Sequence, residues 1–282
     1  MIHIITDTTS GLPEEISTQY HIPIIPQIIV FGEKSFFERT ELDNATFMKM
    51  LRASKELPKT AAPPPELFIQ EFDRLVPLGG TILCIHPSAE VSGTVRAAIM
   101  AAKEFPGSDI RVIDTRTVGS PLATLVELAA EWASQGEPAD AIEAKIQLMI
   151  PRNRIYFLVD TLEYLAKGGR IGGATALLGS MLKIKPILAL SNGRVDQFEK
   201  ERTQKNAIHR LFELVKLQAA RNGEAYISVM HAGIPELARE FASTLCSEFG
   251  LHSIPILDVP PAIVVHGGPG ILAAAFFTDG SK

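Results

Sequence analysis

Cysteine is scarce in this sequence, and an excess of positive charge is missing. The 282 residues include only two cysteines, Cys84 and Cys246, which stand far apart within apolar patterns. Because this spacing suits no metal site, we expect both thiols to be reduced and buried. The formal net charge is −5, and the sequence has no basic block or basic tail. Nucleic acid and anionic membrane surfaces are therefore poor candidates for the main partner.

Long apolar segments are missing as well. No uncharged apolar run is long enough to span a bilayer, and Lys183 and Lys185 interrupt the best candidate. The opening residues, MIHIITDTTSG, lack the charged start and the long apolar core of a signal peptide. We therefore expect a cytoplasmic protein with no stable membrane insertion.

Motifs for nucleotides, metals and covalent catalysis are also absent. The sequence contains no P-loop, no dinucleotide-binding fingerprint and no Gly-x-Ser-x-Gly nucleophile elbow. Its seven histidines are scattered, and no two of them have the spacing of a metal-ligand pair. We expect neither a metal nor a cofactor.

What is present is a large apolar fraction, 46 % of the residues, arranged as alternating strands and helices. Buried strands are predicted at Ile2–Thr6, Gly79–Ile85 and Ile110–Asp114. Each strand leads through a polar loop into a helical pattern, which is typical of a doubly wound parallel sheet. A further apolar run, Ile22–Phe31, contains two prolines and is expected to be an edge strand or an irregular one.

The second half of the chain has a different pattern. Pro151 to Arg154 is the natural seam, which divides the chain into α/β domains at 1–152 and 153–282. Asn192-Gly193 is a strong hairpin signal, so residues 186–190 and 194–198 should pair antiparallel. The C-terminal domain is therefore expected to hold a mixed sheet with helices.

Two segments are expected to position polar side chains. The proline-rich stretch 57–65 should be a rigid loop that holds Thr60 in place. The residues Glu201-Arg202-Thr203 are expected to begin a long helix that ends near Arg221.

Arg170 stands out because Gly168-Gly169 precede it and Gly172-Gly173 follow shortly after. Glycines are most useful where the backbone takes unusual angles or another group comes close. One interpretation is a guanidinium held at a tight corner. The other is an ordinary helix C-cap with an arginine that points into water.

Hydroxyl and cationic side chains recur at such glycine- or proline-fixed corners. They are Thr60, Ser92, Thr94, Arg170, Arg202 and His266. Ser92 and Thr94 follow a strand and open a helix, where unpaired backbone N–H groups attract an anion. The set suits a small anion held by several charge-assisted hydrogen bonds. Plain helix capping by Ser92 is the alternative.

Several of these stretches resemble the DegV family of bacterial fatty-acid-binding proteins. The resemblance rests on DTTSGLP from Asp7, on Ser92-Gly93-Thr94, on a long block from Phe157 to Leu188 with KGGRI and KIKPIL, and on HGGPG from His266. The chain departs from the family pattern at four positions. Gly11 replaces an acidic residue, Ala61 and Ala62 replace Ser and Gln, and His86 replaces a serine.

The resemblance implies a carrier of a palmitate- or oleate-like fatty acid, bound in an apolar cleft or tunnel between the two domains. It assigns Thr60, Ser92, Thr94 and His266 to the carboxylate. Arg170 and Arg202 are assigned to the head-group region or to a kinase-facing surface. The stretches 174–190 and 262–277 could line the tunnel, although core packing explains them equally well. A separate ATP-dependent kinase subunit would convert the acid to an acyl phosphate for phospholipid metabolism, so the carrier is not catalytic alone.

Two alternatives remain open at this point. One is a serine/histidine hydrolase of a lipid or acyl ester, which would use Ser88 or Ser92 with His266 and with Asp7 or Asp114 as the orienting acid. The other is a protein of the same fold that has lost ligand binding, as the alanines at 61 and 62 suggest.

Overall fold

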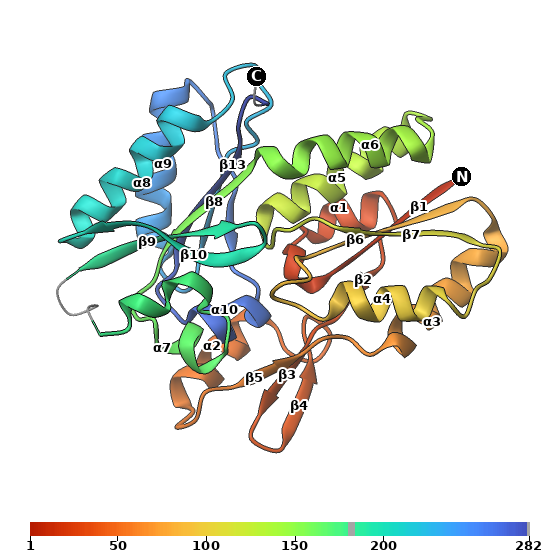
Figure 1. Cartoon of the computed structure of the whole chain (residues 1–282), viewed down its shortest axis with the longest axis horizontal. Helices are drawn as coiled ribbons and strands as arrows, with labels where there is room; N and C mark the ends of the chain where they lie inside the picture. The colour runs from red at the N-terminus through yellow and green to blue at the C-terminus, as the bar shows by residue number, and fades with distance from the viewer. Residues whose placement is uncertain (180–183, 281–282) are drawn as a thin grey trace. The chain divides into compact units, whose positions relative to one another are not determined.

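The chain divides into two compact units, Met1–Ile150 and Pro151–Lys282. The structure is a computed structural model that describes residues 1–179 and 184–280 (Figure 1). The domain boundary predicted from the sequence, between residues 152 and 153, lies two residues from this division.

The N-terminal unit is built on a four-stranded parallel sheet. Its strands, in spatial order, are β2 (Ile24–Ile25), β1 (Ile2–Asp7), β6 (Thr81–His86) and β7 (Asp109–Asp114). The helices α3 (Pro65–Leu75) and α4 (Thr94–Ala102) pack on one face, and α5 (Ser120–Ser134) covers the other (Figure 1). The predicted doubly wound parallel sheet is confirmed.

Apolar residues at alternate positions of these strands create the core of the unit. Ile5, Ile82 and Cys84 face α3 and α4 and contact Phe68 and Phe72. Cys84 is fully buried, and this burial raises the pKa of its thiol far above the ordinary value.

A small antiparallel sheet was not expected in this unit. Its strands, in spatial order, are β4 (Lys34–Phe37), β3 (Ile28–Phe31) and β5 (Lys59–Ala61). The apolar run 22–31 is thus shared between two sheets, since its first part supplies β2 and its second part β3. The stretch predicted to be a rigid loop contains an edge strand, because Thr60 pairs with Ile29.

Six further elements complete the N-terminal unit. They are η1 (Thr8–Ser10), α1 (Glu14–Gln19), α2 (Asn44–Ala53), η2 (Val76–Leu78), α6 (Ala139–Met149) and η3 (Ile150–Arg152), the last of which runs across the division. The Asp43 carboxylate accepts the backbone N–H of Thr46 at 2.8 Å, so Asp43 caps α2 as its sequence position indicates.

The C-terminal unit is built on a six-stranded mixed sheet. Its strands, in spatial order, are β10 (Arg194–Glu201), β9 (Lys185–Ser191), β8 (Asn153–Leu158), β13 (Leu272–Phe277), β11 (Ser228–His231) and β12 (Ile256–Asp258). Among the described strands of this sheet, only β11 and β12 pair in parallel. The predicted hairpin is confirmed: Asn192 and Gly193 both have positive φ, as the turn between β9 and β10 requires.

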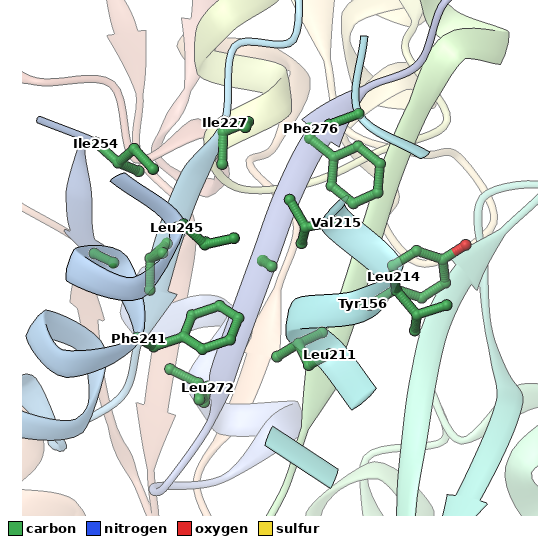
Figure 2. Packing of buried hydrophobic residues seen from close by; sticks show 14 of the residues in the cluster. Tyr156, Leu211, Leu214, Val215, Ile227, Phe241, Leu245, Ile254, Leu272 and Phe276 are labelled. Carbon is green, nitrogen blue, oxygen red and sulfur yellow. The ribbon is translucent and has the colours of Figure 1, made fainter. Parts of the chain in front are cut away.

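Helices α8 (Gln204–Gln218) and α9 (Pro235–Phe249) pack on this sheet and close its core. Figure 2 shows Leu211 and Val215 of α8 and Phe241 of α9 around Leu272 and Phe276 of β13. Each side chain of this size contributes on the order of 1.5–3 kcal/mol when fully buried. Leu272, Ala274 and Phe276 thus serve core packing, the alternative to a tunnel wall for the 262–277 stretch. Part of the 174–190 stretch, residues 180–183, lies outside the described residues.

The prediction that a helix begins at 201–203 is wrong by three residues. Glu201 is the last residue of β10, where it pairs with Lys185, and Thr203 is the N-cap whose hydroxyl accepts the Asn206 N–H. Three shorter elements remain: α7 (Glu163–Lys167), η4 (Gly172–Leu177) and α10 (Pro261–Gly267). Within residues 1–179 and 184–280, no helix is long and apolar enough to cross a membrane.

Candidate functional site

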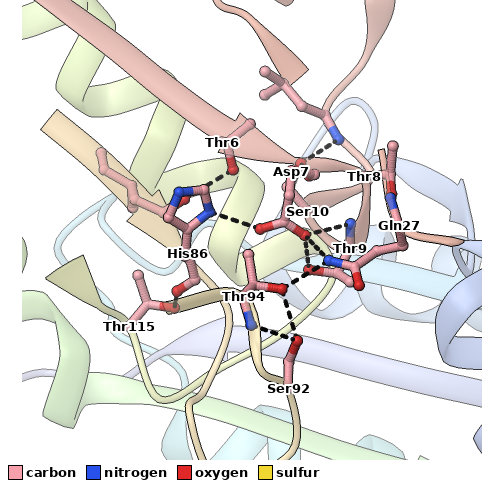
Figure 3. A network of polar contacts seen from close by, with 12 residues as sticks. Thr6, Asp7, Thr8, Thr9, Ser10, Gln27, His86, Ser92, Thr94 and Thr115 are labelled. Atoms are coloured by element: carbon pink, nitrogen blue, oxygen red, sulfur yellow. Dashed lines mark hydrogen bonds and ion pairs between the residues drawn. The ribbon is translucent and has the colours of Figure 1, made fainter. Parts of the chain in front are cut away.

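Asp7 is the centre of a buried polar network at the carboxyl end of β1 (Figure 3). Its Oδ1 accepts the Thr9 N–H at 3.0 Å, the Thr9 hydroxyl at 2.6 Å and the Gln27 amide nitrogen at 3.1 Å. Its Oδ2 lies 2.8 Å from Nδ1 of His86. A carboxylate can only accept hydrogen bonds, so Nδ1 of His86 carries the proton in this contact. Both Asp7 and His86 are fully buried.

Gln27 connects Asp7 to the start of α4. Its Nε2 donates to Asp7 Oδ1 and also to the Thr94 hydroxyl, at 2.9 Å. The orientation of the amide follows from chemistry, because the opposite orientation would set the carbonyl oxygen of Gln27 against the carboxylate of Asp7. Thr94 therefore accepts a hydrogen bond from Gln27.

The direction of the next hydrogen bond follows from burial. Thr94 is completely buried, and its hydroxyl lies 2.7 Å from the Ser92 hydroxyl. Among the described residues, the hydrogen bonds of the Thr94 hydroxyl run to Gln27, which donates, and to Ser92. A buried hydroxyl without an acceptor costs about 1–3 kcal/mol, so Thr94 donates and Ser92 accepts. Ser92 also accepts the Thr94 backbone N–H at 3.3 Å.

Ser92 therefore keeps its own hydroxyl proton available for another acceptor. The residue is partly exposed and directly precedes Gly93, the N-cap of α4. Backbone N–H groups and the helix dipole at this end favour a negative charge. The N-cap of α4 is Gly93 and not Ser92, so the capping interpretation of Ser92 is wrong in this respect, although its hydroxyl accepts the Thr94 N–H. The proton of Ser92 is not used within the network.

Thr60 reaches this region through the segment that follows it. A Cβ atom on Gly93 would lie 3.0 Å from the Cβ of Ala62, so the chain after β5 packs directly against the Ser92-Gly93-Thr94 turn. Thr60 itself is half-buried in β5. Within this unit, the fold thus brings the segment of Thr60 next to Ser92 and Thr94.

The two site residues predicted near the chain's middle and end meet in the C-terminal unit. Arg170 donates from Nη1 to the Gly168 carbonyl at 2.7 Å, directly after α7. Gly169 has a φ of +69° and ends the helix, so the C-cap interpretation holds. The guanidinium nevertheless folds back onto the helix end and is partly buried, so the corner interpretation also describes it.

His266 lies against this helix end. A Cβ atom on Gly168 would lie only 2.3 Å from Nδ1 of His266, so the imidazole packs on the bare backbone of that glycine. Burial, with a contribution from the positive charge of Arg170, lowers the pKa of His266 to about 4. His266 is therefore neutral at pH 7, and Arg170 supplies the positive charge of this pair.

The glycines of the HGGPG segment allow it to interlock with residues 160–168. A Cβ atom would lie 2.6 Å from the Tyr164 ring if added to Gly268, and 2.1 Å from the Asp160 carboxylate if added to Gly270. Both glycines also have positive φ, of +82° and +83°. These contacts fix the position of His266 relative to Arg170.

Arg202 is separate from this pair in the structure's contacts. It is exposed and directly precedes Thr203, the N-cap of α8. A positive side chain there is open to a partner molecule.

The acids considered for a hydrolase have other roles in the fold. Asp114 accepts the backbone N–H of Ala89 at 3.3 Å and of Arg116 at 2.9 Å, which holds a loop. Asp7 is paired with His86, whose Nε2 is buried and has no hydrogen-bond partner among the described residues. Asp7 is thus paired with an imidazole other than His266, the base in the hydrolase alternative. The described residues also contain no cluster of metal-binding side chains.

The network of Asp7, Gln27 and His86 was not predicted as a site. One signal was available, because Asp7 and His86 are the last residues of neighbouring parallel strands, β1 and β6. Carboxyl ends of adjacent parallel strands lie at the same edge of a sheet. Gln27 gave no such signal, since it lies in the irregular connection between β2 and β3.

Comparison with known proteins gives one consistent result. The family model described as "Uncharacterised protein, DegV family" matches residues 1–279. A DegV domain-containing protein of Streptomyces coelicolor is 36 % identical over 273 residues, which cover 96 % of each chain. Among solved structures, a fatty acid binding DegV family protein from Streptococcus agalactiae is similar with a TM-score of 0.91, 30 % identity and 99 % coverage of both chains. DegV, a fatty acid binding protein from Bacillus subtilis, has a TM-score of 0.87 at 30 % identity and 99 % coverage of both chains.

Proposed function

Because the chain belongs to the DegV family, we propose that it binds a long-chain fatty acid, with the carboxylate held at the start of α4. The observation that carries the proposal is the hydroxyl of Ser92, which the buried network leaves as a donor beside a helix N-terminus. The similarity to fatty-acid-binding DegV structures supports the choice of ligand. An acyl chain of roughly 16 carbons would contribute about 10 kcal/mol before ordering costs, at about 0.8 kcal/mol per buried methylene.

Other residues complete the proposed head-group contacts. Thr94 positions Ser92, and Thr60 adds a second hydroxyl from the segment that packs on Gly93. His266 serves as a further hydrogen-bond partner of the carboxylate, in its neutral form. Arg170 contributes positive charge near the head group or faces the kinase.

Mass spectrometry of the small molecules released from the purified, denatured protein tests this function. We expect about one equivalent of a fatty acid, which would also reveal the chain length. An unrelated protein purified in parallel controls for adventitious lipid. An empty protein that also takes up no added palmitate or oleate would overturn the proposal.

The bound acid is then presented to a separate ATP-dependent kinase subunit, which forms the acyl phosphate in the cytoplasm. The sequence has no P-loop, so a partner that binds ATP fits the composition of this chain. The carrier holds the acid and contributes no catalytic group of its own. Arg202, exposed before α8, would contact the kinase or stabilise the charge of the transferred phosphoryl group.

Replacing Arg202 by alanine tests the kinase-facing role. We expect palmitate binding to be unchanged and acyl phosphate formation with the kinase to fall roughly tenfold, because a charge at the rim of an interface mainly affects association. Arg239→Ala is the matched control, since Arg239 is also exposed and lies on α9. Equal turnover in both variants would remove Arg202 from the kinase-facing surface.

A further inference from the structure

His86 is an unusual residue to bury at the centre of a sheet. It is fully buried, its Nδ1–H donates to Asp7, and its Nε2 has no partner among the described residues. The ring of Phe68 meets it edge-on at 5.3 Å, so its surroundings on this side are apolar. An unsatisfied buried nitrogen destabilises the fold. The presence of a histidine at this position is explained if Nδ1 of His86 serves the site.

His86 is one of the donors that hold the Asp7 carboxylate as the acceptor at the start of this network, together with the N–H and the hydroxyl of Thr9. His86 and Gln27 both donate to Asp7, Gln27 also donates to Thr94, and Thr94 donates to Ser92. Every hydrogen bond in this chain depends on Asp7 being a pure acceptor. This series of hydrogen bonds ends at the partly exposed Ser92, whose own proton is not used within it.

The same residues could form the opposite arrangement if Asp7 lost its imidazole partner. An Asp7 side chain no longer held by His86 can turn away from Gln27, so that the Gln27 amide can rotate and present its carbonyl oxygen to Thr94. Thr94 would then donate to Gln27 and accept from Ser92, and Ser92 would present only lone pairs. Two hydrogen-bond directions are thus available to one set of side chains, and they present opposite chemistry to a ligand.

We propose that His86 and Gln27 are positioning residues that lock this network in the direction that makes Ser92 a donor, so that the site selects a head group that accepts hydrogen bonds, a carboxylate above all. This inference rests on the proposed fatty-acid function. It adds a cause for selectivity, since the head group is chosen by buried residues that never contact it.

Two ligands of equal chain length separate this role from a structural one. Palmitate offers only acceptors, whereas hexadecanol can donate its hydroxyl proton to a serine oxygen. We would measure the dissociation constants of both for the delipidated protein by calorimetry. The wild type should prefer palmitate. His86→Phe, which keeps a ring but removes the donor, should weaken palmitate binding about tenfold or more, since one charge-assisted hydrogen bond is lost.

Hexadecanol binding distinguishes this role from a merely structural one, which would weaken both ligands equally. His86→Phe should leave its binding within about threefold, because a reversed Ser92 accepts the alcohol proton as readily as it donated before. The ratio of the two constants therefore collapses. His86→Asn, whose amide can donate from the position of Nδ1, should restore most of the ratio. Equal losses for both ligands, or an unchanged ratio, would overturn the inference.

A second variant keeps the test decisive if His86→Phe does not fold. Gln27→Met has a similar length and removes the amide, so Thr94 no longer receives a directing donor, and the same collapse of the ratio is expected. Ser92→Ala should weaken palmitate in either background. A wild type that binds neither ligand would refute the proposed function itself, whereas a wild type that prefers palmitate with variants that keep this preference would refute only the inference.

Discussion

His266 is a neutral imidazole held beside a positive charge. It packs on Gly168, and the guanidinium of Arg170 is bonded to the carbonyl of the same glycine. Protonation of His266 would place two positive groups together in a partly buried position. His266 therefore adds no charge of its own at neutral pH.

This environment makes the stability of the protein depend on pH through His266. The pKa of His266 is about 4 in the folded chain and about 6.5 when unfolded, so the unfolded chain takes up the proton first as pH falls. The contribution is fully present above pH 6.5 and is lost between pH 6.5 and 4. We expect the free energy of unfolding in urea to fall by about 2 kcal/mol more between pH 7 and 5 in the wild type than in His266→Gln. Parallel pH profiles for the two proteins would show that folding does not lower the pKa of His266.

The sequence predicted which residues lie at the start of α4 better than it predicted which residues contact them. Ser92 and Thr94 were expected at a helix start after a buried strand, and both are there because local sequence encodes that junction. His86 was seen only as a departure from the family pattern. Its partner Asp7 is 79 residues away, and only the pairing of β1 with β6 brings them together.

At the scale of elements, the four glycines of segment 168–173 meet different structural requirements. Gly169 has a φ of +69° and open space where a side chain would stand. Gly172 has a φ of +51°, and a Cβ atom there would lie 2.1 Å from the backbone carbonyl oxygen of Val195 in β10. The first needs only a left-handed backbone, whereas the second needs contact with a strand.

Alanine at these two positions should therefore have unequal effects on stability. Gly169→Ala should cost roughly 1–2 kcal/mol, the price of a left-handed alanine. Gly172→Ala should cost at least about 2 kcal/mol more, because η4 must move away from β10. Chemical denaturation of the two variants measures the difference. Equal losses would mean that the β10 contact does not form.

Elements with local signals were predicted, and those that depend on distant pairing were not. The Asn192-Gly193 turn determines its hairpin from local sequence alone. β5 was not predicted because Thr60 pairs with Ile29, which is distant from it in the sequence. The start of α8 was misplaced because Glu201 pairs with Lys185, which extends β10 into the expected helix.

For the whole molecule, the single tryptophan provides a probe of one unit. Trp132 lies in α5, within Met1–Ile150, where Ser92 and Thr94 also lie. A ligand that binds only the folded form stabilises it, by about 2.7 kcal/mol when its free concentration is 100 times the dissociation constant. We expect palmitate to raise the unfolding free energy reported by Trp132 fluorescence by about this amount. Ser92→Ala at the same palmitate concentration should show a smaller rise, and an unaffected tryptophan signal would place the fatty acid outside this unit.

The fold class was accessible from the sequence because each unit repeats simple rules over a long stretch. Alternating strands and helices indicated the parallel sheet, and one turn indicated the mixed sheet. The hydrogen-bond network was not accessible, since it depends on atoms from β1, β6, α4 and the β2–β3 connection.

The interlocked glycines have a consequence for inheritance. Residues 160–168 and 266–270 pack closely against each other, although about a hundred positions separate them in the chain. A side chain at Gly268 would displace Tyr164, and one at Gly270 would displace Asp160. The sequence of one segment therefore cannot change without a matching change in the other. In recombination between relatives, the two segments should be exchanged together. A crossover between them would join two segments that evolved to fit different partner segments.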